Sequence, residues 1–352
     1  MVKKSFAALI TFFLIIGALF FAPLNTNALD IFPFVVIATN NLNGQILPFS
    51  YGDYKDEGGL VKVATVVDNI RKEVEVREGY TMLVDGGNSL SGSDIANYLT
   101  KRPLPNKPHP VIALMNNMGY DAAGYGTLDF SLTSAVRDAR KRESQFTWVS
   151  TNAYLGNNLY ASDHRMLVYD VPESAHVLKI AVLSLPDPTK VTAIPADSIK
   201  GITFSDPAEE VIKASDILKE IERADFIVLL TDMEWEKDPV KRKDSTLYKI
   251  LERSRIDVCI CGSDEPIPGV QLFFPDSPEF KEHDVLVSSP GKYGLGVSRV
   301  ELMLEKCKCP VKPYEVMKRE DETRQISGKV VKVGRAIEVS KEAMTVVQPY
   351  LD

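Results

Sequence analysis

The two stretches that decide the fold are FVVIATNNLNG (residues 34–44) and TMLVDGGNSLSG (residues 81–92). Each opens with a short apolar run, as expected of a strand buried on both faces, and each closes with polar residues and glycine. Between them, apolar residues recur every three or four positions, which predicts a helix over 59–77. Strand, helix and strand in this order indicate a parallel or mixed sheet with helices packed on its faces.

The same alternation continues along the chain. Further buried strands are expected at 147–150, 179–184, 225–230 and 257–261, and further helices at 132–142, 206–223 and 239–253. Residues 101–110 (KRPLPNKPHP) are expected to form a loop because they are rich in proline. After Gly291 the pattern predicts a strand at 296–304 and a hairpin or extended tail at 326–339. The sequence therefore predicts an α/β domain over 29–305 and a β-rich C-terminal extension over 306–352.

The first 28 residues have the features of a targeting segment. Lys3 and Lys4 precede an apolar run over 6–22, and small residues follow at 26–28. A cleaved signal peptide over 1–28 is expected, with a retained signal anchor as the alternative. In both cases the rest of the chain is expected outside the cytoplasm, in the periplasm or the extracellular space. Contact with a membrane is expected only if the segment is retained.

Charge and cysteine content narrow the choice of function. The formal net charge of −7 argues against nucleic-acid binding, which depends on lysine and arginine neutralising phosphates. Cys259 and Cys261 lie in an apolar run and are expected to be buried. Cys307 and Cys309 stand among lysines, which lower a thiol pKa. A redox role for these four cysteines is therefore kept as an alternative, and a disulfide between the two pairs is geometrically easier than one within a pair.

Five polar segments are the candidate ligand-binding segments. Four of them directly follow predicted strands, and the fifth lies between two of them. Open α/β sheets bind ligands at the carboxyl ends of their strands. The segments are residues 39–44, 85–92, 126–130, 230–232 and 261–265.

These five segments, in this order, resemble the catalytic domain of the 5′-nucleotidase and UDP-sugar hydrolase family. The resemblance extends over about residues 34–304 and includes framework turns such as Gly58-Gly59-Leu60 and GKYGLG at 291–296. It implies the four-layer α/β/β/α sandwich of the metallophosphatases. The family has a separate C-terminal domain whose aromatic residues stack on the nucleoside. That domain is not expected here, because too little chain remains after residue 304.

The first, second and fourth family motifs carry replacements at their ligand positions. The first motif of the family reads T-N-D-L-H-G, and here Asn41 and Asn43 stand at the ligating Asp and His. The second reads D-A-G-D, and Asn88 stands at its bridging Asp. The fourth is a strand that ends in His, where this chain has Asp232.

The third and fifth motifs are changed in the same way. The third reads G-N-H-E-F, and here Thr127 stands at the ligating Asn, Leu128 at the catalytic His and Asp129 at the Glu. The fifth reads G-G-H-S-H, with Ser263 and Glu265 at its two His positions.

The replacements bear directly on cofactors and catalysis. The resemblance implies two divalent metals, which clamp the attacking and leaving oxygens and are held by imidazoles and carboxylates. The four histidines of the chain, at positions 109, 164, 176 and 283, lie outside the motifs. We therefore predict no catalytic residue, no metal site and no cofactor. A second hypothesis is an oxygen-rich pocket for Ca²⁺ or Mg²⁺ built from the carboxylates of Asp129, Asp232, Asp264 and Glu265.

Three functions are consistent with the sequence. The leading prediction is an exported, catalytically inactive metallophosphatase-fold protein that binds a small polar ligand or a protein partner. The first alternative is an active metal-dependent phosphoesterase or 5′-nucleotidase with an unorthodox site. The second is a redox accessory protein that uses its C-x-C pairs.

Overall fold

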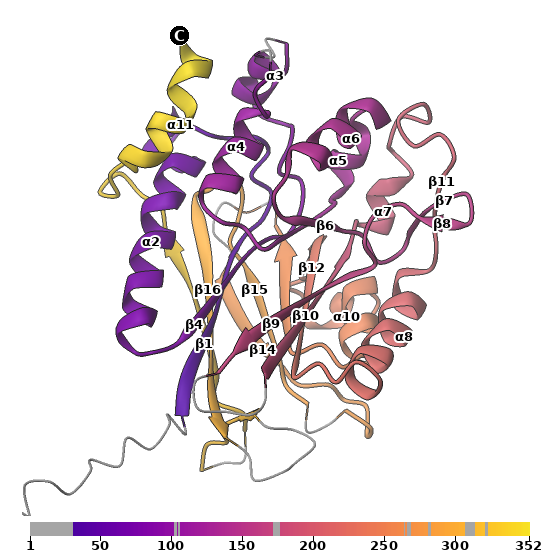
Figure 1. The fold of residues 1–352 in the computed structure, drawn as a ribbon. Coiled ribbons are helices and arrows are strands. Elements are labelled where there is room, and N and C mark those ends of the chain that lie inside the picture. The colour runs from indigo at the N-terminus through magenta and orange to yellow at the C-terminus, as the bar shows by residue number, and fades with distance from the viewer. Residues whose placement is uncertain are drawn as a thin grey trace, which may run out of the picture.

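The computed structural model describes residues 31–101, 104, 106–171, 177–263, 265, 269–280, 283–306, 314–320 and 323–352. The predicted signal segment, Cys307 and Cys309 lie outside these ranges. Within them, no helix combines the length and the apolar character that crossing a bilayer requires. Two large sheets lie face to face, and helices cover their outer faces (Figure 1).

The first sheet has seven strands, and its centre is the first strand of the chain, β1 (Ile31–Thr39). On one side β1 pairs in parallel with β4 (Tyr80–Asp85), and on the other it pairs antiparallel with β16 (Gly296–Lys306). The other strands of this sheet are β5 (Ala122–Gly124), β6 (Thr147–Val149), β17 (Tyr314–Val316) and β18 (Ile326–Lys332).

The second sheet has six strands, of which the four central ones are parallel. Its two edge strands run antiparallel to their neighbours. In spatial order the strands are β14 (Gly269–Phe273), β15 (Val285–Ser289), β13 (Val258–Gly262), β12 (Phe226–Glu234), β10 (Val177–Leu185) and β9 (His164–Asp170).

Apolar side chains from both sheets form one core between them. Phe34 and Val36 of β1 belong to the same buried cluster as Val228 of β12 and Ile260 of β13. A second cluster fills the space between the first sheet and its helices, and a third lies on the outer face of the second sheet. The four-layer α/β/β/α sandwich predicted from the sequence is confirmed.

Helices of each outer layer are packed on one sheet. On the first sheet lie α2 (Leu60–Val76) and α4 (Pro110–Asn117), against which α11 (Lys341–Leu351) packs, and on the second lie α8 (Pro207–Glu220) and α10 (Thr246–Leu251). The shorter helices are α3 (Asp94–Thr100), α5 (Thr127–Ser131), α6 (Ser134–Glu143), α7 (Pro188–Val191) and α9 (Pro239–Arg242). Two small sheets join β2 (Phe49–Tyr51) to β3 (Tyr54–Glu57), and β7 (Ala153–Leu155) to β8 (Asn158–Leu159) and β11 (Ile202–Phe204).

Capping side chains determine where several helices begin. The Asp206 carboxylate accepts hydrogen bonds from the backbone N–H groups of Ala208 and Glu209 and starts α8, as its sequence predicts. The helix expected over 239–253 is instead two helices, α9 and α10. The division arises because the Ser245 hydroxyl accepts from the Tyr248 N–H and starts a new helix there.

The C-terminal extension over 306–352 differs from its prediction as a β-rich segment. Its strand β18 pairs with β16, but the chain then forms the helix α11. The Ser340 hydroxyl caps that helix, and its fully buried Ala343 and Val347 join the cluster under the first helix layer. A helix forms here because these apolar residues are spaced four apart, a signal that the prediction of a β-rich extension over 306–352 did not use.

Candidate functional site

A cavity of about 350 Å³ lies at the carboxyl ends of strands from both sheets. We call it the cleft. Seven of the positions that the sequence singled out line it, namely Asn41, Asn43, Asn88, Thr127, Leu128, Asp232 and Ser263. Strand ends of both sheets therefore bring segments distant in the sequence to one place, as the resemblance implied.

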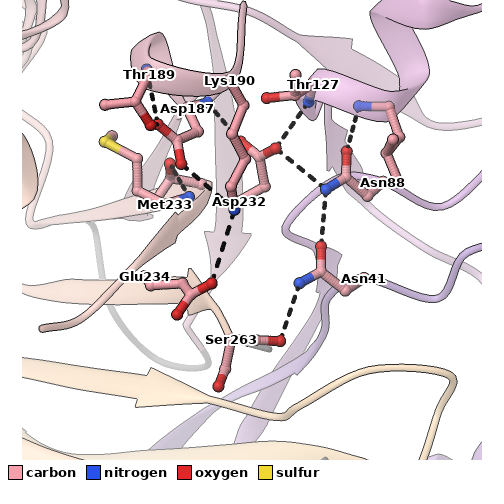
Figure 2. A network of polar contacts seen from close by, with 12 residues as sticks. Asn41, Asn88, Thr127, Asp187, Thr189, Lys190, Asp232, Met233, Glu234 and Ser263 are labelled. Carbon is pink, nitrogen blue, oxygen red and sulfur yellow. Dashed lines mark hydrogen bonds and ion pairs between the residues drawn. The ribbon is translucent and has the colours of Figure 1, made fainter. Parts of the chain in front are cut away.

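The side chain of Asn88 is the centre of the hydrogen bonding in the cleft (Figure 2). Its Nδ2 donates to Asn41 Oδ1 at 2.9 Å and to Asp232 Oδ2 at 3.1 Å. Its Oδ1 accepts from the Leu128 N–H at 2.7 Å. Both amide hydrogens and the oxygen are used, so Asn88, which follows β4, connects the segment after β1 to the carboxyl end of β12 and to α5.

Asp232 is a buried carboxylate whose two oxygens are both engaged. Oδ2 also accepts from the Thr127 N–H at 2.8 Å, and Oδ1 accepts from the Asp187 N–H at 2.6 Å. Only 1% of the residue is exposed, and burial raises the pKa of its carboxyl group above the ordinary value. Asp232 therefore serves to hold neighbouring loops in place.

Asp129 is fully buried and does not line the cleft. Its carboxylate accepts from the backbone N–H groups of Asn88, Leu90 and Gly126. Burial raises the pKa of Asp129 to about 7, although these three donors act in the opposite direction. The residue fixes the loop after β4 against the start of α5.

These side chains do not fit the pair of metal ions that the fold family implies. Asp232 is the cleft's one carboxylate among the described residues, and neighbouring donors already occupy its oxygens. Asn88 directs a nitrogen at Asn41 and Asp232, where a cation would need oxygen ligands. Across the described part of the chain, no three His, Cys, Asp or Glu side chains lie together as a metal site.

Among the described residues, the carboxylates of the hypothetical oxygen-rich Ca²⁺ or Mg²⁺ pocket do not come together. The carboxylates of Asp129 and Asp232 accept hydrogen bonds from backbone N–H groups, and Asp264 lies outside the described residues. Glu265 is exposed and forms an ion pair with Lys237. It lines a neighbouring cavity of about 600 Å³ that shares Lys190 and Ser263 with the cleft.

Four of the eight described non-glycine residues with a positive φ line the cleft. Asn41, Asn43, Asn88 and Tyr293 have φ values of 49°, 50°, 57° and 58°. Asparagine tolerates this left-handed region, but a tyrosine there is uncommon and strained. The strain of Tyr293 is maintained by two backbone hydrogen bonds, in which its N–H donates to Asn41 and its carbonyl accepts from Gly59.

Sequence reasoning missed six residues that line the cleft, namely Ser131, Lys190, Ala193, Ile194, Lys292 and Tyr293. Lys190 and Ile194 lie in or beside the short helix α7, in a stretch that the sequence indicated only as a long connection. Lys292 and Tyr293 belong to the GKYGLG turn, which was recognised as framework. The approach of that turn to Asn41 depends on tertiary structure, so the linear sequence carries no signal for it.

The cysteines and histidines lie away from the cleft in the described residues. Cys259 and Cys261 are free thiols buried in β13, and burial raises the pKa of Cys261 to about 12. A high thiol pKa disfavours the reactive thiolate, so the structure adds no support for a redox role of this pair. Burial likewise lowers the pKa of His109 to about 3.

Replacing Asn88 by aspartate should destabilise the protein while preserving the shape of the side chain. An oxygen would replace the nitrogen that now donates to Asn41 and Asp232, which would place two carboxylates in contact. The expected loss in the free energy of unfolding at pH 7 is about 1–3 kcal/mol, measured by urea denaturation. The control is Glu265→Gln, which changes a nearby charge outside this network, and an unchanged stability of Asn88→Asp would contradict the assignment.

Comparison with known proteins supports the resemblance that the sequence carries, although no family model matches the chain. The chain is 28% identical over 240 residues to a 5′-nucleotidase of Vibrio cholerae and 29% identical over 201 residues to the protein UshA of Escherichia coli. These alignments cover 66% and 56% of this chain, but only 40% and 33% of the two relatives. The chain thus spans well under half the length of these relatives.

Solved structures agree on the fold. The calcineurin-like phosphoesterase YfkN of Bacillus subtilis superposes with a TM-score of 0.73 at 18% identity, covering 91% of this chain and 97% of that one. A 5′-nucleotidase precursor of Thermus thermophilus superposes with a TM-score of 0.66 at 17% identity, covering 91% and 58%.

The comparisons also correct the expectation that the protein takes no cofactor. That expectation is wrong, because the 5′-nucleotidases to which the chain is similar use divalent metals. The described side chains of the cleft give no position for such an ion, so no step is assigned to one. In sequence this chain is thus similar to the 5′-nucleotidases, and in fold it is similar to the calcineurin-like phosphoesterases.

Proposed function

We propose that this protein is an exported, non-catalytic member of its family that binds a small polar ligand or a protein partner in the cleft. The observation that carries the proposal is the hydrogen-bond network of Asn88, Asn41 and Asp232. The polar groups of these side chains form hydrogen bonds with one another. Such a network is expected of a rigid binding surface rather than of an active site. The strained Tyr293 backbone at the same place supports a binding role, because strain of this kind clusters at ligand sites.

The absence of catalysis is argued from what phosphoryl transfer requires. The reaction needs groups that stabilise developing charge, and removal of one such donor already lowers the rate by about 10²–10³. Leu128 stands where the resemblance places the catalytic histidine, and it cannot donate a proton. No described histidine lines the cleft to replace it.

Export rests on the predicted signal segment over 1–28 and on the relatives, because UshA and the related 5′-nucleotidases are exported proteins. The competing function is a working phosphoesterase with an unorthodox site. The names of the relatives favour it, since they are called 5′-nucleotidases.

A substrate panel separates the two functions. AMP, a cyclic 2′,3′-nucleotide, UDP-glucose and bis(p-nitrophenyl) phosphate are incubated with the full chain in the presence of divalent metals. We expect no turnover that depends on the cleft. Activity that disappears in Asp232→Ala and persists in the control Glu265→Ala would overturn the proposal. Activity that is equal in both variants would come from a contaminating enzyme.

A further inference from the structure

We propose that the ligand of the cleft is a small organic anion with an apolar body, whose charge binds to Lys292. This inference rests on the proposed binding function and specifies the chemistry of its ligand. It follows from the charges that line the cleft and from the apolar side chains that line part of it.

The charge that the cleft offers to a ligand is positive. Asp232 is buried, and its oxygens accept from protein donors. Lys190 has its own acidic neighbours, Asp187 at 3.5 Å and Glu234 at 3.7 Å. Lys292 makes no ion pair with any residue that the structure describes, and its Nζ lies 5.7 Å from the centre of the Tyr293 ring. An anion would therefore find its partner in Lys292.

Apolar side chains line part of the same cavity. Leu128 is 41% exposed at the start of α5, although a leucine of this size is usually buried. Ile194 and Ala193 follow α7 and line the cavity with it. A ligand with a hydrocarbon or aromatic body would remove this surface from water, at about 25 cal/mol for each Å².

The combination selects the class of ligand. Inorganic phosphate would pair with Lys292 but leave the apolar side chain of Leu128 in water, and a neutral apolar molecule would leave Lys292 without a counter-ion. A cavity of about 350 Å³ has the size of a small-molecule site. The side chain of Asn43 adds a polar group to its lining. One small amphipathic anion meets all of these conditions.

The test compares three probes by isothermal titration calorimetry on the full chain. 4-Phenylbutyrate carries both features, 4-phenylbutanol lacks the charge, and inorganic phosphate lacks the apolar body. We expect 4-phenylbutyrate to bind at least about tenfold more tightly than either of the others. The affinity should fall as the salt concentration rises, because Lys292 is partly exposed to solvent.

Variants assign the two contacts. Lys292→Gln should weaken 4-phenylbutyrate binding about tenfold, Leu128→Asn should weaken it as well, and the exposed control Lys55→Gln should leave it unchanged. Thermal unfolding of each variant verifies that it is folded. The inference would be overturned if the acid and the alcohol bound with equal affinity. It would also be overturned if Lys292→Gln bound 4-phenylbutyrate as tightly as the wild type does. Binding of the alcohol alone would leave the proposed function standing, whereas cleft-dependent turnover in the substrate panel would overturn that function itself.

Discussion

Replacing Asp257 by alanine is expected to lower the free energy of unfolding by about 3–5 kcal/mol. Asp257 precedes β13 and is 1% exposed. Its carboxylate pairs with Lys219 at 3.0 Å and with Arg324, and it accepts from the Ile227 N–H. Burial by itself would raise the pKa of Asp257, but the Lys219 and Arg324 charges hold it well below the ordinary value. Alanine would leave these two partly buried cations without their shared partner, although Arg324 would keep its ion pair with Asp284.

Urea denaturation at pH 7 measures this loss. The matched control is Asp276→Ala, which removes an exposed carboxylate that pairs with Lys243 at the surface. Such surface pairs contribute little, so the control should be close to the wild type. Similar stabilities for the two variants would mean that the buried pairing of Asp257 does not stabilise the fold. Lowering the pH should also weaken the Asp257 contribution, because a carboxyl group with a depressed pKa loses its stabilising effect as it is protonated.

The contribution of Asp85 to the stability of the wild-type protein should decrease as the pH rises from about 4 to 8, whereas the lowered pKa of His109 acts in the opposite direction. Asp85 is fully buried at the end of β4, and burial raises the pKa of its carboxyl group from 3.8 to about 7. A carboxyl group whose pKa is higher in the folded state than in the unfolded state stabilises the fold fully at pH values below its unfolded pKa. This contribution is lost as the pH rises through its folded pKa. Since one pKa unit corresponds to about 1.4 kcal/mol, the loss from Asp85 amounts to roughly 4 kcal/mol. The raised pKa of Asp129 acts in the same direction.

Asp85→Asn should remove most of this dependence on pH. The asparagine oxygen can accept from the Gly87 N–H, and its amide can donate to the Thr39 hydroxyl. That hydroxyl can then donate to Tyr120, whose oxygen lies 2.8 Å away. Free energies of unfolding at pH 5 and pH 8 measure the effect. The exposed Asp138→Asn should keep the wild-type slope, and an equally steep slope in Asp85→Asn would exclude Asp85 as its source.

Local sequence patterns were sufficient to predict most of the buried strands and the longer helices. The run FVVIAT forms the inner part of β1, and the periodic stretch 59–77 forms α2. The edge strands β9 and β14 were missed, because their side chains are partly exposed and carry no continuous apolar run. The pairing of strands could not be predicted either, because β1 pairs with β16, which lies more than 250 residues later in the sequence.

The site was predictable in its position but only in part in its chemistry. The strand-end rule and the family resemblance placed Asn41, Asn88 and Asp232 around one cleft, where the structure has them. Glu265 was misplaced, because it lines the neighbouring cavity and pairs with Lys237, a contact for which the local sequence carries no signal. The engagement of Asp232 by backbone donors was also hidden, because it depends on loops that converge only in three dimensions. Lys292 became a candidate for the same reason, through the approach of its turn to Asn41.

The central place of β1 in the first sheet also constrains the order of folding. One of its partners, β4, follows soon after it in the sequence, but Ile31 of β1 pairs with Glu305 of β16 on the other side. Contacts between such distant residues slow folding, because a long loop must close before they form. A ribosome delivers β1 long before its second partner, so one edge of this apolar strand stays open until residues near 300 have emerged. During that interval the nascent chain is prone to aggregation, and chaperones would have their greatest influence on its yield.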